Sequence, residues 1–177
     1  FSFFPLLACM IAGLLIGLLI KVFGVTRWHG PADTIYAAHQ KAGSLDTKSG
    51  FLSTIAAFFS ISGGASVGIY GPLVHFGGTL GAFLRSRSFI PNVPHDIIIG
   101  SGVAAAISAG FSSPLAGIIF AHEVILRYFS IRALTAISLA SVSASFLAQW
   151  LNIVEPDLRF LVISFELVNS IPGLIIV

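Results

Sequence analysis

The sequence has 177 residues, of which 56% are hydrophobic and 9% charged, with a mean hydropathy of +0.98. Soluble domains carry about 25% charged residues, so this composition excludes an ordinary soluble protein and indicates an integral membrane protein. The net charge of +2 comes without a basic cluster and gives no support for nucleic-acid binding. Uncharged runs at 1–20, 49–84, 97–122 and 133–154 supply the predicted membrane-spanning segments.

The two ends of the chain suggest a piece of a longer protein. The sequence starts at Phe1 without a methionine or a basic signal-peptide region, and it ends in the apolar stretch IPGLIIV. We therefore expect residues 1–177 to form one partial transmembrane domain whose second half is missing. The lone Cys9 lies in an apolar run, so neither a disulfide framework nor a metal site is predicted.

The first predicted elements are a spanning helix and a short helix. Residues 2–24 are apolar between a proline near the start and a glycine near the end, which predicts one membrane-spanning helix. The sequence HGP at 29–31 is a glycine turn leading into a proline, a pattern typical of a helix start, and it predicts a short helix at 31–40. The polar residues 40–50 are predicted to form a connection outside the bilayer.

The central run of residues 49–84 carries no Asp, Glu, Lys or Arg. One bilayer-crossing helix needs about 20 apolar residues, so this run is too long for one span and short for two full spans with a polar turn. A continuous helix would tolerate its middle poorly, since within ten residues it holds Gly63, Gly64, Gly68, Gly71 and Pro72. The sequence predicts two helices, at 51–60 and 72–84, that break and meet inside the bilayer around a glycine-rich turn.

A break of this kind predicts a site. Pro72 suits the first turn of the second helix, and the free N–H groups of that turn point into the break with the positive end of the helix dipole. Such half-helix starts suit an anion within a membrane. The alternative is that the glycines only allow close packing between helices, and the stretch alone does not decide between the two.

Three further helices are predicted in the last third of the chain. Residues 96–111 are rich in Gly, Ala and Ser, which indicates a helix packed closely among others. A second helix is predicted from Pro114 to about Arg127, with Ser112 or Ser113 as its N-cap. Residues 133–152 form a third predicted span with Trp150 as an interface anchor, followed by a polar loop from Glu155 and another apolar stretch.

Three motifs resemble the N-terminal half of the CLC chloride channel and transporter family. The segment GGASVGIYGPLVHFGG is similar to that family's G-x-E-G-P filter segment, and GVAAAISAGFSSPLAGIIFAHEVI is similar to its A-x-F-x-x-P-L-A-G-x-x-F-x-x-E segment. The segment RWHGPAD stands at the place of the family's G-S-G-I-P segment, in a degraded form. Together the motifs cover about residues 2–152.

The resemblance implies an all-α, multi-pass membrane protein whose tilted and broken helices form one half of an inverted repeat. It also implies a homodimer in the bilayer of the inner or plasma membrane, with a separate anion pathway in each subunit. The substrate would be chloride or another small anion, and no cofactor is expected. Carried over by position, the outer anion site would be lined by the backbone amides of Gly68, Ile69, Tyr70 and Gly71, and the loop at His29 and Gly30 would approach the central site.

Two departures from the family pattern bear on mechanism. The gating glutamate of G-x-E-G-P corresponds to Tyr70, which has no charge at neutral pH because a phenol has a pKa near 10. The internal glutamate of the exchangers corresponds to Val124. We therefore expect passive, channel-like chloride conduction not coupled to protons, with Tyr70 at the gate. The alternatives are an anion transporter of altered selectivity and a membrane scaffold that has lost conduction.

Two histidines leave their roles open. His29 replaces the serine of G-S-G-I-P, and its imidazole could donate a hydrogen bond to an anion or block the site by its size. His122 and Glu123 begin an H-E-x-x-H zinc motif, but residue 126 is Leu, so the second ligand is missing. We predict no enzyme, a packed His122 with a satisfied hydrogen bond, and a structural, capped or paired Glu123.

Overall fold

The computed structural model describes residues 3–25, 27–40, 45–66, 68–87 and 93–151, and throughout them the regular structure is helical. This confirms the predicted all-α class. The predicted loop and apolar stretch after Glu155 lie outside the described residues. In chain order the helices are α1 (Phe4–Phe23), α2 (Pro31–His39), α3 (Thr47–Ser62), α4 (Tyr70–Ser86), α5 (His95–Phe111), α6 (Pro114–Phe120), the π-helix η1 (Ala121–Leu126) and α7 (Ile131–Trp150).

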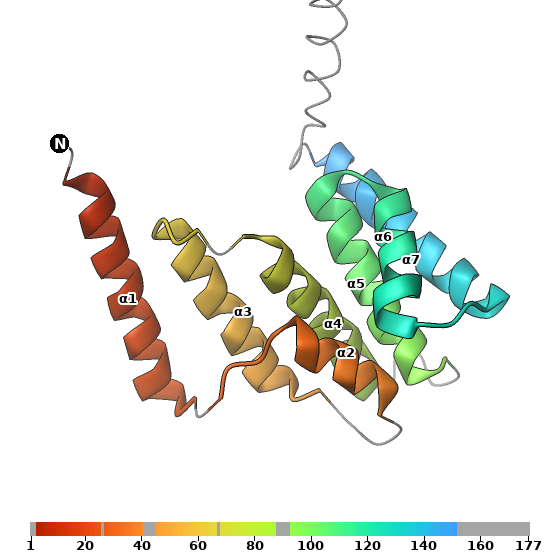
Figure 1. Cartoon of the computed structure of the whole chain (residues 1–177), viewed down its shortest axis with the longest axis horizontal. Coiled ribbons are helices and arrows are strands. Elements are labelled where there is room, and N and C mark those ends of the chain that lie inside the picture. Colours follow the sequence, from red (N-terminus) through yellow and green to blue (C-terminus); the bar gives the residue numbers. More distant parts are fainter. Residues whose placement is uncertain (1–2, 26, 41–44, 67, 88–92, 152–177) are drawn as a thin grey trace, which may run out of the picture.

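The helices form a row with α1 at one edge and α5, α6 and α7 grouped at the other (Figure 1). Helix α3 packs against α1 and α4, α2 packs against α4, and α5 packs against both α4 and α7. The core is centred on α5, as the small, apolar composition of 96–111 predicted. Its fully buried members include Ile99, Val103 and Ala104 of α5, Val74 of α4 and Ile137 of α7.

Two helices are long and apolar enough to cross a membrane, judged by length and composition within the described residues. They are the segments Leu6–Phe23 of α1 and Ile131–Trp150 of α7. Helices α3 and α4 have 16 and 17 residues, which at 1.5 Å per residue is roughly 24–26 Å and less than the ~30 Å of a bilayer's hydrocarbon core. Their length fits the predicted pair that breaks around a glycine-rich turn.

Helix boundaries differ from the predictions where a local cap decides them. Helix α3 begins at Thr47 and not at residue 51, because the carboxylate of Asp46 accepts a hydrogen bond from the backbone N of Lys48 at 3.2 Å. The last part of the predicted polar connection is therefore helical. Ser113 stands at the N-cap of α6 as predicted, but its side chain makes no capping hydrogen bond.

The predicted helix from Pro114 to Arg127 changes its winding halfway. Its first part is the α-helix α6, and the second part, η1, is a π-helix. The π-helix ends at Leu126, and the following residue, Arg127, has a φ of +58° and donates its backbone N–H to the carbonyl of His122 at 2.9 Å. Sequence patterns of apolar residues do not distinguish the two windings, since a π-turn inserts a single extra residue.

Glycines hold α4 and α5 in backbone contact. A Cβ atom built on Gly102 would lie 2.2 Å from the carbonyl oxygen of Gly77, and one on Gly77 would lie 2.5 Å from the carbonyl oxygen of Gly102. The close packing predicted for residues 96–111 is therefore confirmed at this contact. Among the glycines between α3 and α4, Gly63 also packs closely, since a Cβ atom built on it would lie 2.4 Å from Cβ of Ala12 in α1. Gly64 and Gly68 serve the turn instead, with φ values of +96° and +72°, which glycine adopts without steric cost.

Candidate functional site

The start of α4 lies at the end of the glycine-rich turn. Helix α3 ends at Ser62 and α4 begins at Tyr70. Pro72 is the third residue of α4, so it lies in the first turn as predicted. The carbonyl of Ile69 accepts a hydrogen bond from the backbone N of Leu73 at 3.1 Å, which closes that turn.

The backbone amides of residues 68–71 donate to no acceptor in the part of the chain that the structure describes. Unpaired amides at a helix start carry the positive end of the helix dipole, and together they form a natural place for an anion. The predicted outer-site residues Gly68, Ile69, Tyr70 and Gly71 thus share one feature, which is a run of available donors.

The side chain of Tyr70 lies against α6. Its ring meets the ring of Phe120 edge-on, with centroids 5.3 Å apart and an angle of 88° between the planes. The residue is 44% exposed, and within the described chain its hydroxyl has no hydrogen-bond partner. The aromatic contact fixes the position of the ring while leaving the polar end of the side chain available.

The start of α2 differs from that of α4 because its amides are occupied. The backbone N of His29 donates to Ser53 Oγ at 2.9 Å, and the backbone N of Gly30 donates to Asp33 Oδ2 at 2.9 Å. The Asp33 carboxylate also pairs with Arg27 at 2.8 Å. An anion near His29 and Gly30 would therefore meet side-chain donors and not these two backbone N–H groups.

A cavity of about 140 Å³ lies where the starts of α2 and α4 meet α3. The two helix starts are in contact, since a Cβ atom on Gly71 would lie 3.5 Å from Cγ of Pro31. Of the predicted site residues, the cavity brings together three and leaves Gly68, Ile69 and Tyr70 outside its lining. The lining consists of His29, Gly30, Pro31, Ser53, Thr54, Ala57, Gly71, Pro72 and His75.

Sequence reasoning missed His75. This side chain is 2% exposed, its Nδ1 lies 2.9 Å from Thr34 Oγ1, and its ring stacks on that of His29 with centroids 6.4 Å apart and planes at 8°. A usable signal was present, because His75 follows Gly71 by four residues and residues four apart share one face of a helix. The site was predicted from the glycines of residues 49–84, and His75, the one histidine of that run, was not included in the prediction.

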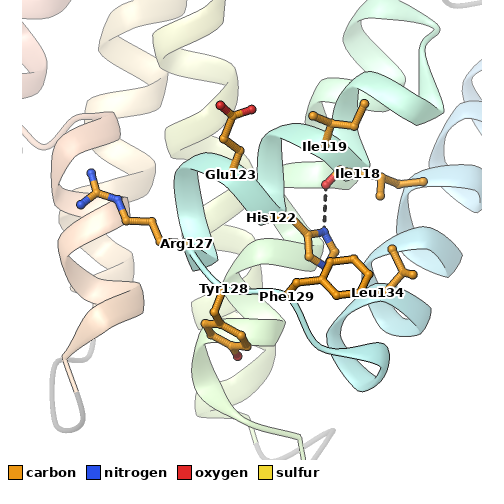
Figure 2. Close-up of a pocket in the computed structure, with 8 residues that line it drawn as sticks. All are labelled: Ile118, Ile119, His122, Glu123, Arg127, Tyr128, Phe129 and Leu134. Atoms are coloured by element: carbon orange, nitrogen blue, oxygen red, sulfur yellow. Dashed lines mark hydrogen bonds between the residues drawn. The ribbon is translucent and has the colours of Figure 1, made fainter.

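A second hollow, about 570 Å³ in volume, lies beside η1 (Figure 2). His122 Nδ1 lies 3.0 Å from the carbonyl oxygen of Ile118, which confirms a hydrogen bond at that nitrogen. Nε2 of His122 is buried without a hydrogen-bond partner among the described residues, so the ring is satisfied at one nitrogen only. Figure 2 shows Glu123 and Tyr128 pointing in opposite directions. Within the described chain Glu123 forms no salt bridge and no group of three metal-ligating side chains occurs, so the expected pairing of Glu123 is not seen.

Comparisons with known proteins identify the family to which this helical chain is similar. The family model described as voltage gated chloride channel matches residues 12–176. Similar curated proteins include the voltage-gated ClC-type chloride channel ClcB of Escherichia coli O81 (strain ED1a), of Escherichia coli (strain K12 / DH10B) and of Shigella boydii serotype 18. Each is 27% identical over 150 residues, which cover 83% of this chain and 35% of the relative. The chain thus spans about a third of the length of these relatives. No solved structure matches it significantly.

Proposed function

The chain belongs to the voltage gated chloride channel family, and we propose that the full-length protein conducts chloride passively across a membrane, without coupling to protons. The observation that carries the proposal is the start of α4, where the amides of residues 68–71 donate to no described residue. Donors fixed by a helix start suit an ion that must be bound and released quickly, because they need no rearrangement when the ion arrives.

The absence of proton coupling rests on two side chains. Tyr70 stands at the first position of α4, where the family resemblance implies a gating glutamate, and a phenol is uncharged at neutral pH. Val124 lies in η1, where the resemblance implies the internal glutamate of the exchangers. Neither side chain can accept and release protons near pH 7, so chloride would cross alone.

We also propose that the full-length protein is a multi-pass homodimer in the inner or plasma membrane. The long apolar helices α1 and α7 support a membrane location, since 6% of Leu6–Phe23 and 28% of Ile131–Trp150 are buried within the chain. Apolar side chains left this exposed suit lipid or a packed neighbour. Light scattering of the detergent-purified protein tests the assembly, and a monomeric mass at all concentrations would contradict it.

The test of function is chloride efflux from liposomes that contain the full-length protein. The vesicles are loaded with potassium chloride, valinomycin balances the charge, and external chloride and pH are recorded together. We expect wild type to release chloride with no accompanying proton movement, and a proton ionophore to leave the rate unchanged. Chloride flux that drives protons against their gradient would refute uncoupled conduction.

Variants of Tyr70 connect the flux to the start of α4. Tyr70→Glu places a negative charge beside the free amides, so it should slow chloride efflux at pH 7 and do so less at pH 4.5, where the carboxyl is largely protonated. Tyr70→Ala should alter the rate, because the ring packed on Phe120 is removed. The matched control is Tyr36→Ala, an exposed tyrosine of α2. Flux from Tyr70→Ala but not from wild type would identify the tyrosine as a plug, and no flux from any variant would favour the scaffold.

A further inference from the structure

We propose that a hollow at one end of the helix row binds a phosphate group, either free or in a lipid headgroup. The hollow lies where α2, α4 and η1 end and α5 begins (Figure 1). It is called the α5 hollow below, and its polar lining consists of His39, Gln40, Arg85, His95, Asp96 and Tyr128. It is separate from the amides at residues 68–71 and does not depend on chloride conduction.

Positive charge gathers at this end of the row. Each described Lys and Arg lies at or beside a helix end on this side, and these residues are Lys21, Arg27, Lys48, Arg85, Arg87, Arg127 and Arg132. The described carboxylates are fewer, namely Asp33, Asp46, Asp96 and Glu123. At the opposite end, the described residues 63–66, 68–69 and 111–113 carry no charge. Basic residues beside a membrane attract anionic headgroups, so this end suits a phosphate.

Arg85 supplies a fixed positive charge to the α5 hollow. It lies in the last turn of α4 and donates one N–H to the carbonyl of Val93. A guanidinium has five N–H donors, and no other acceptor for them occurs among the described residues. The bond to Val93 holds the side chain in place, and the remaining donors suit bidentate pairing with phosphate oxygens.

His95 points to an occupant of the α5 hollow. It is the first residue of α5, and its Nε2 atom is buried without a hydrogen-bond partner among the described residues. A buried unpaired polar atom costs free energy. A phosphate oxygen that accepts from Nε2 removes this cost when that nitrogen carries the hydrogen.

The backbone at the start of α5 adds further donors. The N–H groups of His95, Asp96 and Ile97 have no acceptor among the described residues. They carry the positive end of the dipole of a 17-residue helix. The volume of the α5 hollow, about 540 Å³, falls within the roughly 300–1,000 Å³ of small-molecule sites, which is enough for a phosphate and its ester substituent.

One carboxylate also lines the α5 hollow. Asp96 Oδ2 accepts a hydrogen bond from the Tyr128 hydroxyl at 2.5 Å. Its negative charge opposes a phosphate and lowers the affinity of the site. Asp96→Asn keeps an acceptor for Tyr128 and removes the charge, so this variant should bind phosphate more tightly, an effect that a merely structural role would not produce.

Binding is measured by isothermal titration calorimetry on the full-length protein, purified in a detergent without phosphate. The probes are inorganic phosphate and dioctanoyl phosphatidic acid, a soluble lipid that carries the same group. Dioctanoyl glycerol, which lacks the phosphate, is the ligand control. The test variants are Arg85→Gln, His39→Ala and Asp96→Asn, and Arg87→Gln is the matched control, an exposed arginine at the same helix end that does not line the α5 hollow.

We expect the dissociation constant of the phosphate probe that binds to rise about tenfold in Arg85→Gln, which corresponds to ~1.4 kcal/mol, and about threefold in His39→Ala. It should fall about threefold in Asp96→Asn and stay unchanged in Arg87→Gln. If Arg85→Gln does not fold because the bond to Val93 is lost, the variants of the exposed His39 and of Asp96 still decide the question.

The two phosphate probes distinguish the sources of the ligand. Binding of phosphatidic acid without inorganic phosphate assigns the site to a lipid headgroup, and equally tight binding of inorganic phosphate assigns it to the free ion. Equal affinity in wild type, Arg85→Gln and Asp96→Asn would overturn the proposal. So would the absence of binding of either phosphate probe to wild type, or binding of dioctanoyl glycerol as tight as that of phosphatidic acid.

Discussion

Gly102→Ala tests the backbone contact between α4 and α5. The added Cβ atom would lie 2.2 Å from the carbonyl oxygen of Gly77 and 3.1 Å from its carbonyl carbon. Both atoms belong to the backbone, so no side chain can rotate away and the two helices must move apart. Because α5 is also the centre of the core and packs on α7, a shift at this contact disturbs several buried layers.

The expected cost follows from overpacking a filled interior. One methyl group in a closely packed core destabilises by about 1–3 kcal/mol, which for a domain of this size lowers the melting temperature by roughly 2–12 °C. The assay is thermal denaturation of the detergent-purified full-length protein, followed by size-exclusion chromatography of what remains monodisperse. All variants are heated at one scan rate, because membrane proteins often unfold irreversibly.

The matched control is Gly17→Ala in α1, where an added Cβ atom meets no atom within 4 Å. This variant should denature within about 1 °C of wild type, since it changes no contact and alanine is the better helix former. A melting temperature of Gly102→Ala equal to that of Gly17→Ala would refute the reasoning. It would mean that α4 and α5 are not in backbone contact at these glycines.

Three further substitutions test other parts of the fold. Ser108→Ala removes the hydrogen bond from Ser108 Oγ to the carbonyl of Ser141 at 2.6 Å. The melting temperature should fall by the equivalent of about 0.6 kcal/mol, a typical value for a side-chain hydrogen bond between membrane helices. An unchanged melting temperature would contradict this expectation. Gly68 has a φ of +72° with open space around it, so Gly68→Ala should destabilise the protein by about 1 kcal/mol through backbone strain. Gly68→Asn should destabilise it by less, because asparagine tolerates this conformation better. Equal stability of wild type and both variants would argue against a left-handed conformation at Gly68. Burial and the hydrogen bond to Asp96 raise the pKa of Tyr128 to about 12. A raised folded-state pKa stabilises below the unfolded value of about 10 and is lost as pH approaches 12, so the difference in melting temperature between wild type and Tyr128→Phe should shrink from pH 9 to pH 12, whereas a constant difference would contradict the shift.

Local signals in the sequence were sufficient for most helix positions. Apolar runs and prolines predicted α1, α2 and α6, and the small-residue composition of 96–111 predicted the buried α5. The break between α3 and α4 followed from glycines that a helix tolerates poorly. These features act within a few residues of the chain, because capping, backbone strain and span length depend on neighbours in sequence. Free donors at the start of the second helix were predicted for the same reason, whereas their assignment to residues 68–71 came from the family resemblance.

Tertiary structure decided what depends on residues far apart in the chain. His75 and Thr34 are 41 positions apart in the sequence, and His29 and Ser53 are 24 apart, so no local sequence pattern predicts these contacts. The hydrogen bond from the Gly30 amide to Asp33 and the salt bridge between Asp33 and Arg27 likewise became evident only from the folded structure of this loop. The sequence by itself determined where helices start and break. The packing of α2 and α3 on α4 determined which donors are used inside the protein and which remain free, because hydrogen-bond satisfaction is settled only when the elements come together.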